Sequence, residues 1–210
     1  ATSTLNEQSI VCIYKPIAGE RPLWDFADGC LAHREYAAFL VSEQLGFNLV
    51  PLTILREGPY GNGMVQQWID IDESIDLGKF FATDHPRLRA MALFDAIINN
   101  TDRKIGHLLP VDDESVFGCD HGVTFHSEDK LRTVLWQWEQ LPLLPSEIQT
   151  LKLLETALTA ETGALIQELI TEEEFNKRVK LLNDVDLSMI VETTDETDLS
   201  GELACAGGVC

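Results

Sequence analysis

Apolar and polar positions along the chain repeat at intervals that predict strands in its first third and mostly helices in the rest. Residues 9–14 form a β-branched and aromatic run that ends at a Lys-Pro pair, which is typical of a strand. Residues 86–99 begin with a proline and place apolar side chains at helical spacing, which predicts a helix. Further strands are expected over 50–55, 64–69, 107–110 and 115–119, and further helices over 31–45, 148–158 and 171–182.

The order of these elements predicts an α+β fold with two lobes. Residues 1–69 would form a small N-terminal β lobe that carries one helix, and residues 70–183 a mainly helical C-terminal lobe with a short hairpin. The segment 66–72 would connect the two lobes.

Two loops of the first lobe have distinct signals. Segment 58–63 is rich in glycine between two apolar runs, which predicts a hairpin turn. Segment 17–29 contains two glycines and Pro22 and is expected to be an ordered loop. We expect Trp24 and Phe26 to hold that loop against the core.

Composition limits the classes of partner. The formal net charge is −20, which argues against a protein that binds nucleic acid or an anionic membrane unaided. No apolar run approaches the ~20 residues that a membrane span needs. Five scattered cysteines are too few for a disulfide scaffold and favour a reducing, cytoplasmic location. Residues 184–210 hold acidic residues but no Lys or Arg, and are expected to be a disordered acidic tail.

Lys15 and Glu35 are the first candidate functional pair. Glu35 lies on a helical stripe that is otherwise apolar, and a buried carboxylate needs a partner because an unpaired buried charge is unfavourable. Lys15, at the end of an apolar strand, is such a partner. A purely structural ion pair, or a Glu35 that reaches solvent at the helix edge, is the alternative.

A dense polar segment follows the helix that is expected over 86–99. In it, Asp102 could accept a proton from a hydroxyl nucleophile, Lys104 could neutralise a phosphoryl group, and His107 could bind a cation or a phosphate. The alternative is a loop closed by an Asx turn at Asn100 or Asp102.

Asp120 is the third candidate, because it ends a short apolar strand and is followed by a His-Gly pair. A carboxylate in that position suits a divalent cation. An acidic residue in an ordinary β-turn is the alternative.

The order of these elements is more specific than any one of them. A strand lysine, a helix glutamate, Asp-x-Lys-x-x-His and then Asp-x-Gly is the order found in protein-kinase-type phosphotransferases. Over residues 1–183 the chain resembles the bacterial phosphatidylinositol 3-/4-kinase-like proteins, atypical kinases related to the HipA-type kinases. The resemblance rests on residues 14–26, 34–38, 50–51, 58–59, 94–95, 99–100, 102–104, 120–122 and 130–136.

The resemblance implies an ATP site. Lys15 would hold the α- and β-phosphates and Glu35 would orient it. Gln67, Trp68 and Ile69 would form the hinge that contacts the adenine.

The resemblance also implies the catalytic and metal residues. Asp102 would be the catalytic aspartate, with Lys104 beside the phosphate, and Asp120 would bind Mg²⁺. Lys104 stands where related lipid-type kinases have His, and His107 stands where they have the metal-binding Asn. Neutral imidazole suits Mn²⁺ better than Mg²⁺, so the cofactors expected are ATP with Mg²⁺ or Mn²⁺.

The resemblance leaves the activity itself open. The expected reaction is phosphoryl transfer from ATP to a hydroxyl of an unknown small molecule or protein, and a pseudokinase that binds only nucleotide or a partner, or AMP transfer from the same site, are the alternatives. Residues 126–132 would lie in the activation segment. A phosphate-covering hairpin should precede Lys15, so Ala1–Asn6 are expected to be the end of its turn, with the first strand missing.

Overall fold

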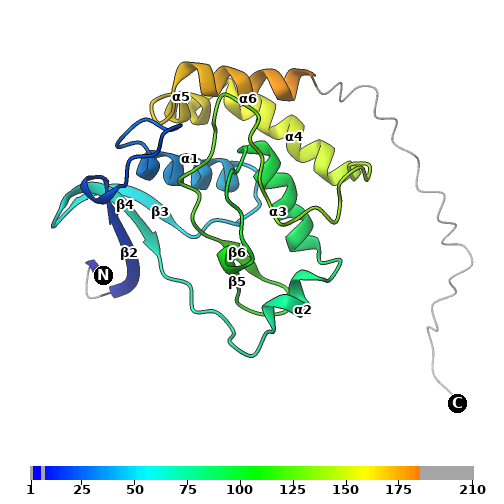
Figure 1. Cartoon of the computed structure of the whole chain (residues 1–210), viewed down its shortest axis with the longest axis horizontal. Coiled ribbons are helices and arrows are strands. Elements are labelled where there is room, and N and C mark those ends of the chain that lie inside the picture. The colour runs from blue at the N-terminus through cyan, green and yellow to red at the C-terminus, as the bar shows by residue number, and fades with distance from the viewer. Residues whose placement is uncertain (1, 6–7, 185–210) are drawn as a thin grey trace, which may run out of the picture.

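The computed structural model describes residues 2–5 and 8–184 and is a mixed α+β structure with a small sheet and several helices (Figure 1). Its strands are β1 (Thr2–Leu5), β2 (Gln8–Pro16), β3 (Thr53–Gly58), β4 (Gly61–Gln67), β5 (Leu108–Pro110) and β6 (Val116–Gly118). Its helices are α1 (Leu31–Gln44), α2 (Leu77–Phe81), α3 (Pro86–Ile97), α4 (Pro145–Leu158), α5 (Glu161–Gln167) and α6 (Glu172–Asp184), with short 3₁₀ turns η1 (Ile17–Gly19) and η2 (Ile105–His107).

The described residues form a four-stranded antiparallel sheet in the order β1-β2-β4-β3. Strands β3 and β4 form the hairpin predicted at 58–63, with Gly58 opposite Gly61 and a two-residue turn between them. Gly61 has a φ of 89°, a left-handed conformation that glycine adopts without a steric penalty. In the β2–β4 register, Lys15 lies opposite Met64 near the end of the sheet.

Helix α1 joins the sheet to the helical part of the molecule. It lies between the sheet and helices α4 and α5 (Figure 1). The helix ends where the sequence predicts, because Gly46 adopts a φ of 64° just beyond it. At its start, the Glu20 carboxylate accepts the backbone N–H groups of Leu31 and Ala32 at 3.0 and 2.8 Å. This cap fixes the first turn of α1 against the loop that follows β2.

The hydrophobic core is one cluster that includes residues of α1 and of α3 to α6. The spacing that predicts α3 is confirmed, since its apolar stripe is fully buried: Leu88, Met91, Phe94 and Ile98. The predicted short hairpin at 107–119 is also present as β5 and β6, which lie beside α3. The core therefore provides a rigid base for the polar segment that follows α3.

Several expectations differ from the structure. Trp24 is 91% exposed rather than packed on the core, whereas Phe26 is buried as predicted. Thr2–Leu5 form a strand paired with β2, not the end of a turn, because they complete a ladder with Leu5 opposite Gln8. The strand expected over 50–55 is β3, which lies at Thr53–Gly58, since Pro51 has no N–H for pairing with a neighbouring strand. Helices α2 and α5 were not expected.

Two further expectations concern the acidic tail and membrane-spanning segments. The expected acidic tail, apart from Asp184 at the end of α6, lies outside the described residues. Among the helices that the structure describes, none has both the length and the apolar character to cross a bilayer.

Candidate functional site

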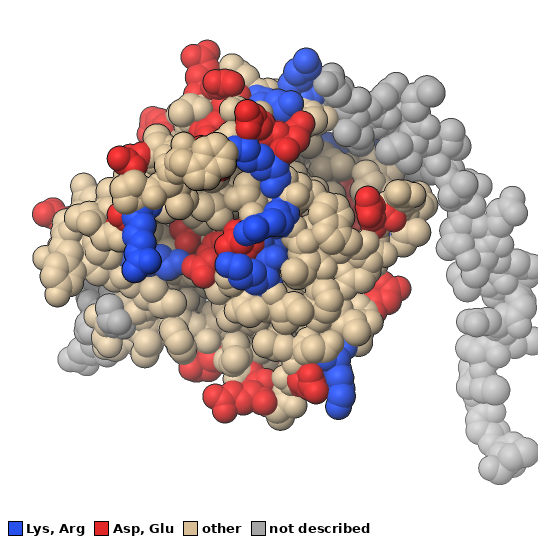
Figure 2. Space-filling view, viewed as in Figure 1, with Lys and Arg blue, Asp and Glu red and all other residues tan. Residues whose placement is uncertain are grey.

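A cavity of about 510 Å³ opens between the end of β2, the start of α1 and the loops before β5 and after β6. Its lining includes six of the residues that the sequence singles out: Lys15, Glu35, Asp102, Lys104, His107 and Asp120. Figure 2 shows a hollow on this face with acidic side chains inside it and basic side chains at its rim. The volume lies in the range of small-molecule sites.

Lys15 is held by two carboxylates. Its ammonium donates to Glu35 Oε1 at 2.9 Å and also to Asp120. Glu35 is 4% exposed and Lys15 is 40% exposed, so the lysine reaches from a buried partner toward solvent. Burial disfavours the charged lysine, but Glu35 and Asp120 more than offset this and raise its pKa above the usual range. Lys15 therefore presents a permanent positive charge in the cavity.

Asp120 and His107 lie close together in the lining of the same cavity. Their closest atoms, His107 Nε2 and Asp120 Oδ2, are 3.6 Å apart. Burial opposes ionisation of Asp120, yet Lys15 and then His107 hold its pKa below the usual value. Burial lowers the pKa of His107, so the imidazole is neutral near pH 7 and able to ligate a cation. Asp120 has a φ of 59°, a conformation that aspartate tolerates better than most residues.

Asp102 lines the same cavity and pairs with two cations. Lys104 Nζ donates to it at 2.6 Å, and Arg132 donates to its other oxygen. Its own backbone N–H donates to Asn100 Oδ1 at 3.0 Å, which is the Asx turn weighed from the sequence. Despite partial burial, the two cations lower the pKa of Asp102, so it is ionised at neutral pH.

A buried ion pair supports the loop that carries Asp102. Arg103 and Asp95 are fully buried and their side chains are 2.7 Å apart. Arg103 also lies 2.7 Å from His121 Nε2 and donates to the Cys119 carbonyl at 3.1 Å. Arg103, held by Asp95 of α3, thereby connects the segment that presents Asp102 to the segment that presents Asp120.

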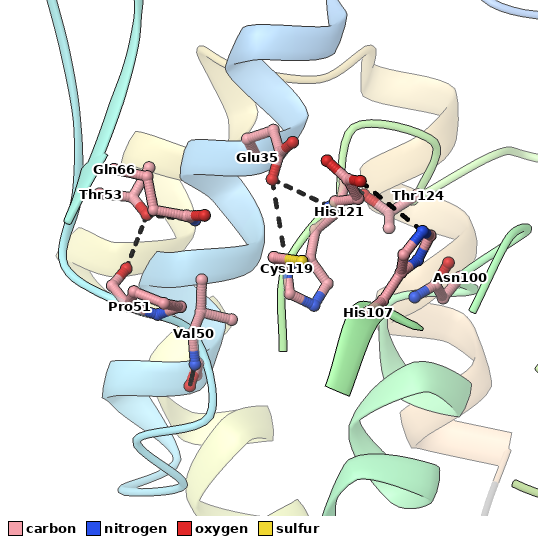
Figure 3. Close-up of polar contacts among 12 residues, drawn as sticks. Glu35, Val50, Pro51, Thr53, Gln66, Asn100, His107, Cys119, His121 and Thr124 are labelled. Carbon is pink, nitrogen blue, oxygen red and sulfur yellow. Dashed lines mark hydrogen bonds and ion pairs between the residues drawn. The ribbon is translucent and has the colours of Figure 1, made fainter. Parts of the chain in front are cut away.

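His121 connects this buried pair to Glu35. Its backbone N–H donates to Glu35 Oε2 at 2.9 Å, and Figure 3 shows Glu35 on α1 directed toward this loop. Full burial, together with the charge of Arg103, lowers the pKa of His121 well below 6.5. Because Arg103 donates to Nε2, the proton of the neutral ring lies on Nδ1. The ring is thus a fixed, uncharged spacer behind the Lys15–Glu35 pair.

Three residues that shape the site had no individual role predicted from the sequence, although Arg132 falls within the expected activation segment. Glu20 lines the cavity and caps α1, Asp95 supports the loops, and Arg132 pairs with Asp102. Glu20 lies eleven residues before the helix it caps, outside the usual capping offset. Only the buried, charged Asp95 on an apolar helix stripe was a detectable signal.

The expected hinge residues lie apart from this cavity. Gln67 ends β4, its N–H donates to the Leu52 carbonyl, and Trp68 is half exposed and donates its backbone N–H to Val11. Neither these two nor Ile69 lines the 510 Å³ cavity. A ligand that used both regions would have to extend along β2 and β4.

The donor set fits a nucleotide and a hard cation only in part. Lys15 and Lys104 can hold phosphate oxygens, and Asp120 and His107 can each donate to one cation. His107 Nδ1 is buried with no hydrogen-bond partner among the described residues. Within those residues no group of three His, Cys, Asp or Glu side chains is arranged to hold a metal ion. A cation here would therefore need ligands from phosphate and water as well.

Comparisons with known proteins give one clear relationship. No protein-family model matches the chain. The chain is 44% identical over 191 residues to Protein Rv2133c of Mycobacterium tuberculosis (strain ATCC 25618 / H37Rv), and the match covers 74% of this chain and 69% of that protein. This match includes most of both chains, so it bears on the fold as a whole and not on one motif.

Proposed function

The chain belongs to the same protein family as Protein Rv2133c, and we propose that it is an ATP-dependent phosphotransferase with a two-lobed, protein-kinase-like fold. The observation that carries the proposal is the convergence of Lys15, Glu35, Asp102 and Asp120 on one cavity, although up to 105 residues separate contacting pairs in the sequence. A structural ion pair explains Lys15 and Glu35 alone. It does not explain why two further carboxylates, those of Asp102 and Asp120, line the same cavity.

The arrangement of elements supports the proposed lobes. The sheet and α1 would form the first lobe, and α2 to α6 with the β5–β6 hairpin would form the second. The lysine lies on a sheet strand, its glutamate on α1, which packs against that sheet, and the two aspartates on loops of the helical part. This is the disposition expected of a kinase-like enzyme of the phosphatidylinositol 3-/4-kinase-like type.

Lys15 would bind the phosphates of the nucleotide. In the structure its ammonium bonds Asp120, so phosphate oxygens would compete for the same donor. Glu35 keeps its own bond to Lys15 from a buried position and would hold the ammonium while Asp120 is released. Asp120 would then be available to a cation.

Asp120 and His107 would hold that cation, Mg²⁺ or Mn²⁺. When bound, the cation would neutralise charge on the phosphates, which a cluster of carboxylates would otherwise repel. The imidazole of His107 favours Mn²⁺ over Mg²⁺. We therefore expect higher activity with Mn²⁺.

Asp102 would orient the acceptor hydroxyl and receive its proton. As the hydroxyl oxygen bonds to the γ-phosphorus, the bond from that phosphorus to the β,γ-bridging oxygen breaks, ADP leaves, and the proton goes to Asp102. Because its pKa is low, Asp102 would act mainly by positioning the hydroxyl until late in the transfer. Lys104 lies 2.6 Å from it and would stabilise the transferring phosphoryl group.

The test is ATP turnover by the full chain with Mg²⁺ and with Mn²⁺. We expect Asp102→Asn to reduce turnover by about 10²- to 10⁴-fold, the usual contribution of a catalytic base. The matched control is Asp113→Asn, an exposed aspartate in the β5–β6 turn, which should retain activity. Unchanged turnover in Asp102→Asn would exclude the assigned mechanism.

A pseudokinase is the second candidate, and a specific observation favours it. The charged groups of the cavity already satisfy one another, Lys15 with Asp120 and Asp102 with Lys104 and Arg132. A pseudokinase would be stabilised against heat by ATP and Mn²⁺ but would release no ADP. An intact-mass measurement of any product would separate phosphoryl transfer from AMP transfer.

A further inference from the structure

A second cavity, of about 410 Å³, borders the proposed nucleotide cavity. The two share Asp102 and Val123 in their linings. The remaining walls come from the loop before α1, from Thr101 and from the segment after β6, with Trp24, Lys130 and Arg132 among them. A molecule in the second cavity would therefore reach the proposed catalytic carboxylate from a cavity that Lys15 does not line.

Two cations line this second cavity. Arg132 donates from Nε to the Thr101 carbonyl at 3.0 Å and from Nη2 to Asp102, which fixes the guanidinium although the side chain is 72% exposed. Lys130 Nζ lies 3.2 Å from Asp25 and 3.1 Å from Glu128. Asp25 and Asp102 line the cavity too, so an anionic ligand would bind these two cations in competition with the carboxylates that now pair with them.

Trp24 adds an apolar wall to the same cavity. Its side chain is 91% exposed, and Lys130 Nζ lies 4.8 Å from the ring centroid. The loop around it is nevertheless ordered, because Leu23 and Phe26 form a β-bridge and Phe26 is buried. An ordered loop that presents an indole to solvent offers a flat surface on which a ring or an apolar group can stack.

We propose that this cavity, defined by Trp24, Lys130 and Arg132, is the acceptor site, and that the acceptor is a small hydroxyl compound with an anionic group and an apolar or planar body. The anion, a carboxylate or a phosphate, would bind Arg132 and Lys130, and the body would lie on Trp24. The hydroxyl would then face Asp102. This assignment rests on the phosphotransferase proposed above.

The size of the cavity favours a small molecule over a protein segment. A volume of about 410 Å³ lies within the range of small-molecule sites. An anion on Arg132 would also leave Asp102 paired with Lys104 alone, which would make Asp102 a better acceptor for the hydroxyl proton. Binding of the acceptor would thus increase the proton affinity of Asp102.

The test measures binding of simple probes without nucleotide, so it does not depend on turnover. Phenyl phosphate, benzoate and inorganic phosphate are titrated by calorimetry into the full chain and its variants. We expect phenyl phosphate or benzoate to bind, and Arg132→Gln and Lys130→Gln each to weaken that binding about tenfold or more, as loss of a charge-assisted hydrogen bond does. Trp24→Ala should weaken binding of the aromatic probes but leave inorganic phosphate unchanged.

Two control variants locate the probe. Lys79→Gln removes an exposed cation on α2, away from both cavities, and should leave binding unchanged. Lys15→Gln changes the neighbouring cavity and should leave the binding of benzoate unchanged, whereas inorganic phosphate can also bind Lys15 itself. Loss in Lys15→Gln with retention in Arg132→Gln would place the anion in the nucleotide cavity and overturn the proposal.

Two further outcomes would also overturn it. One is that no aromatic anion binds. The other is that only a long acidic peptide binds through Arg132 and Lys130. Failure of the phosphotransferase proposal is distinguishable from these, because it would appear as absent ATP turnover with probe binding intact.

Discussion

At the scale of single residues, Glu35 has both a structural and a proposed functional task. One of its carboxylate oxygens bonds Lys15, and the other accepts the His121 backbone N–H. The side chain is almost fully buried, so its charge is tolerated only because both oxygens have partners. Replacing the charge while keeping the shape therefore separates the two tasks.

We expect Glu35→Gln to lower the affinity for ATP with Mn²⁺ about tenfold, because Lys15 would lose its buried charged partner. The amide oxygen can still accept the His121 N–H, so the free energy of unfolding should fall by only about 1 kcal/mol. Calorimetric titration and urea unfolding measure the two effects. Glu43→Gln, an exposed change on the same helix, is the control. Equal affinities in the two variants would contradict the role of Glu35.

A pH dependence of stability follows from His121. Burial lowers its pKa well below the ordinary 6.5, so below about pH 6.5 the unfolded chain binds a proton that the folded chain does not. The stability that the neutral ring provides is therefore complete above pH 6.5 and is lost as pH falls, at about 1.4 kcal/mol per pH unit. Burial of His107 adds to the same trend.

Urea unfolding between pH 5 and 7 measures this slope, above the range in which most carboxylates titrate. We expect His121→Gln to have a shallower slope than the unchanged chain, because the amide does not titrate. Its stability at pH 7 should be lower, since Arg103 loses a well-placed acceptor. Equal slopes would show that His121 is protonated in the folded state.

The sequence predicted the polar residues of the cavity better than their partners. Lys15, Glu35 and Asp120 were identifiable because each interrupts or ends an apolar pattern, whereas Asp102 and Lys104 were identified from a dense polar segment after an apolar helix and from the order of the elements. The Arg132–Asp102 contact joins residues thirty positions apart, and no local pattern marks it. Trp24 was assigned to the core on hydrophobicity alone, which does not distinguish a buried indole from an exposed one.

At the scale of elements, the pairing of β2 with β4 positions Lys15. Gly63 lies opposite Pro16, and a Cβ at Gly63 would lie 2.5 Å from the Lys15 carbonyl oxygen. The nearest neighbours are backbone atoms, so the strand itself would have to move. Gly106, in η2, has no atom within 4 Å of an added Cβ. The two glycines form a matched pair.

We expect Gly63→Ala to reduce the free energy of unfolding by about 1–3 kcal/mol, the usual penalty for overpacking. It should also weaken ATP binding, because the end of β2 would shift with Lys15. Gly106→Ala should change stability by less than about 0.5 kcal/mol. Urea unfolding and nucleotide titration check both. A Gly63→Ala protein of normal stability and affinity would show that the β2–β4 register does not constrain the lysine.

Element boundaries were predicted well where periodicity was long. The twelve residues of α3 and its C-cap Ile98 place four buried apolar side chains in one stripe, which few other structures would produce. Helices α2 and α5 have five and seven residues, too few to establish a period. Strand β3 was expected over 50–55, because the apolar run begins before Thr53, where the pairing with β4 begins. Tertiary pairing, not local pattern, sets such ends.

At the scale of the whole molecule, Arg34 links three parts of the fold. Its guanidinium lies over the Phe26 ring at 4.7 Å, donates to the Thr124 carbonyl at 2.5 Å and pairs with Glu174 at 2.6 Å. Both charged side chains are nearly inaccessible to solvent. The sheet-side helix α1 is thereby joined to α6 and to the loop that follows Asp120. Residues distant in sequence share one buried ion pair.

We expect Glu174→Ala to destabilise the chain by about 3–5 kcal/mol, because Arg34 would remain buried without a counter-charge. Loss of the Thr171–Glu174 capping box would add to this effect. Glu173→Ala changes an exposed neighbour on the same helix and should alter stability by less than about 0.5 kcal/mol. If α6 were only an appendage, Glu174→Ala would release it while the sheet and α1 stayed folded. Because the core cluster includes α1 and α6 alike, we expect tryptophan fluorescence and far-UV circular dichroism to report one shared, shifted transition instead.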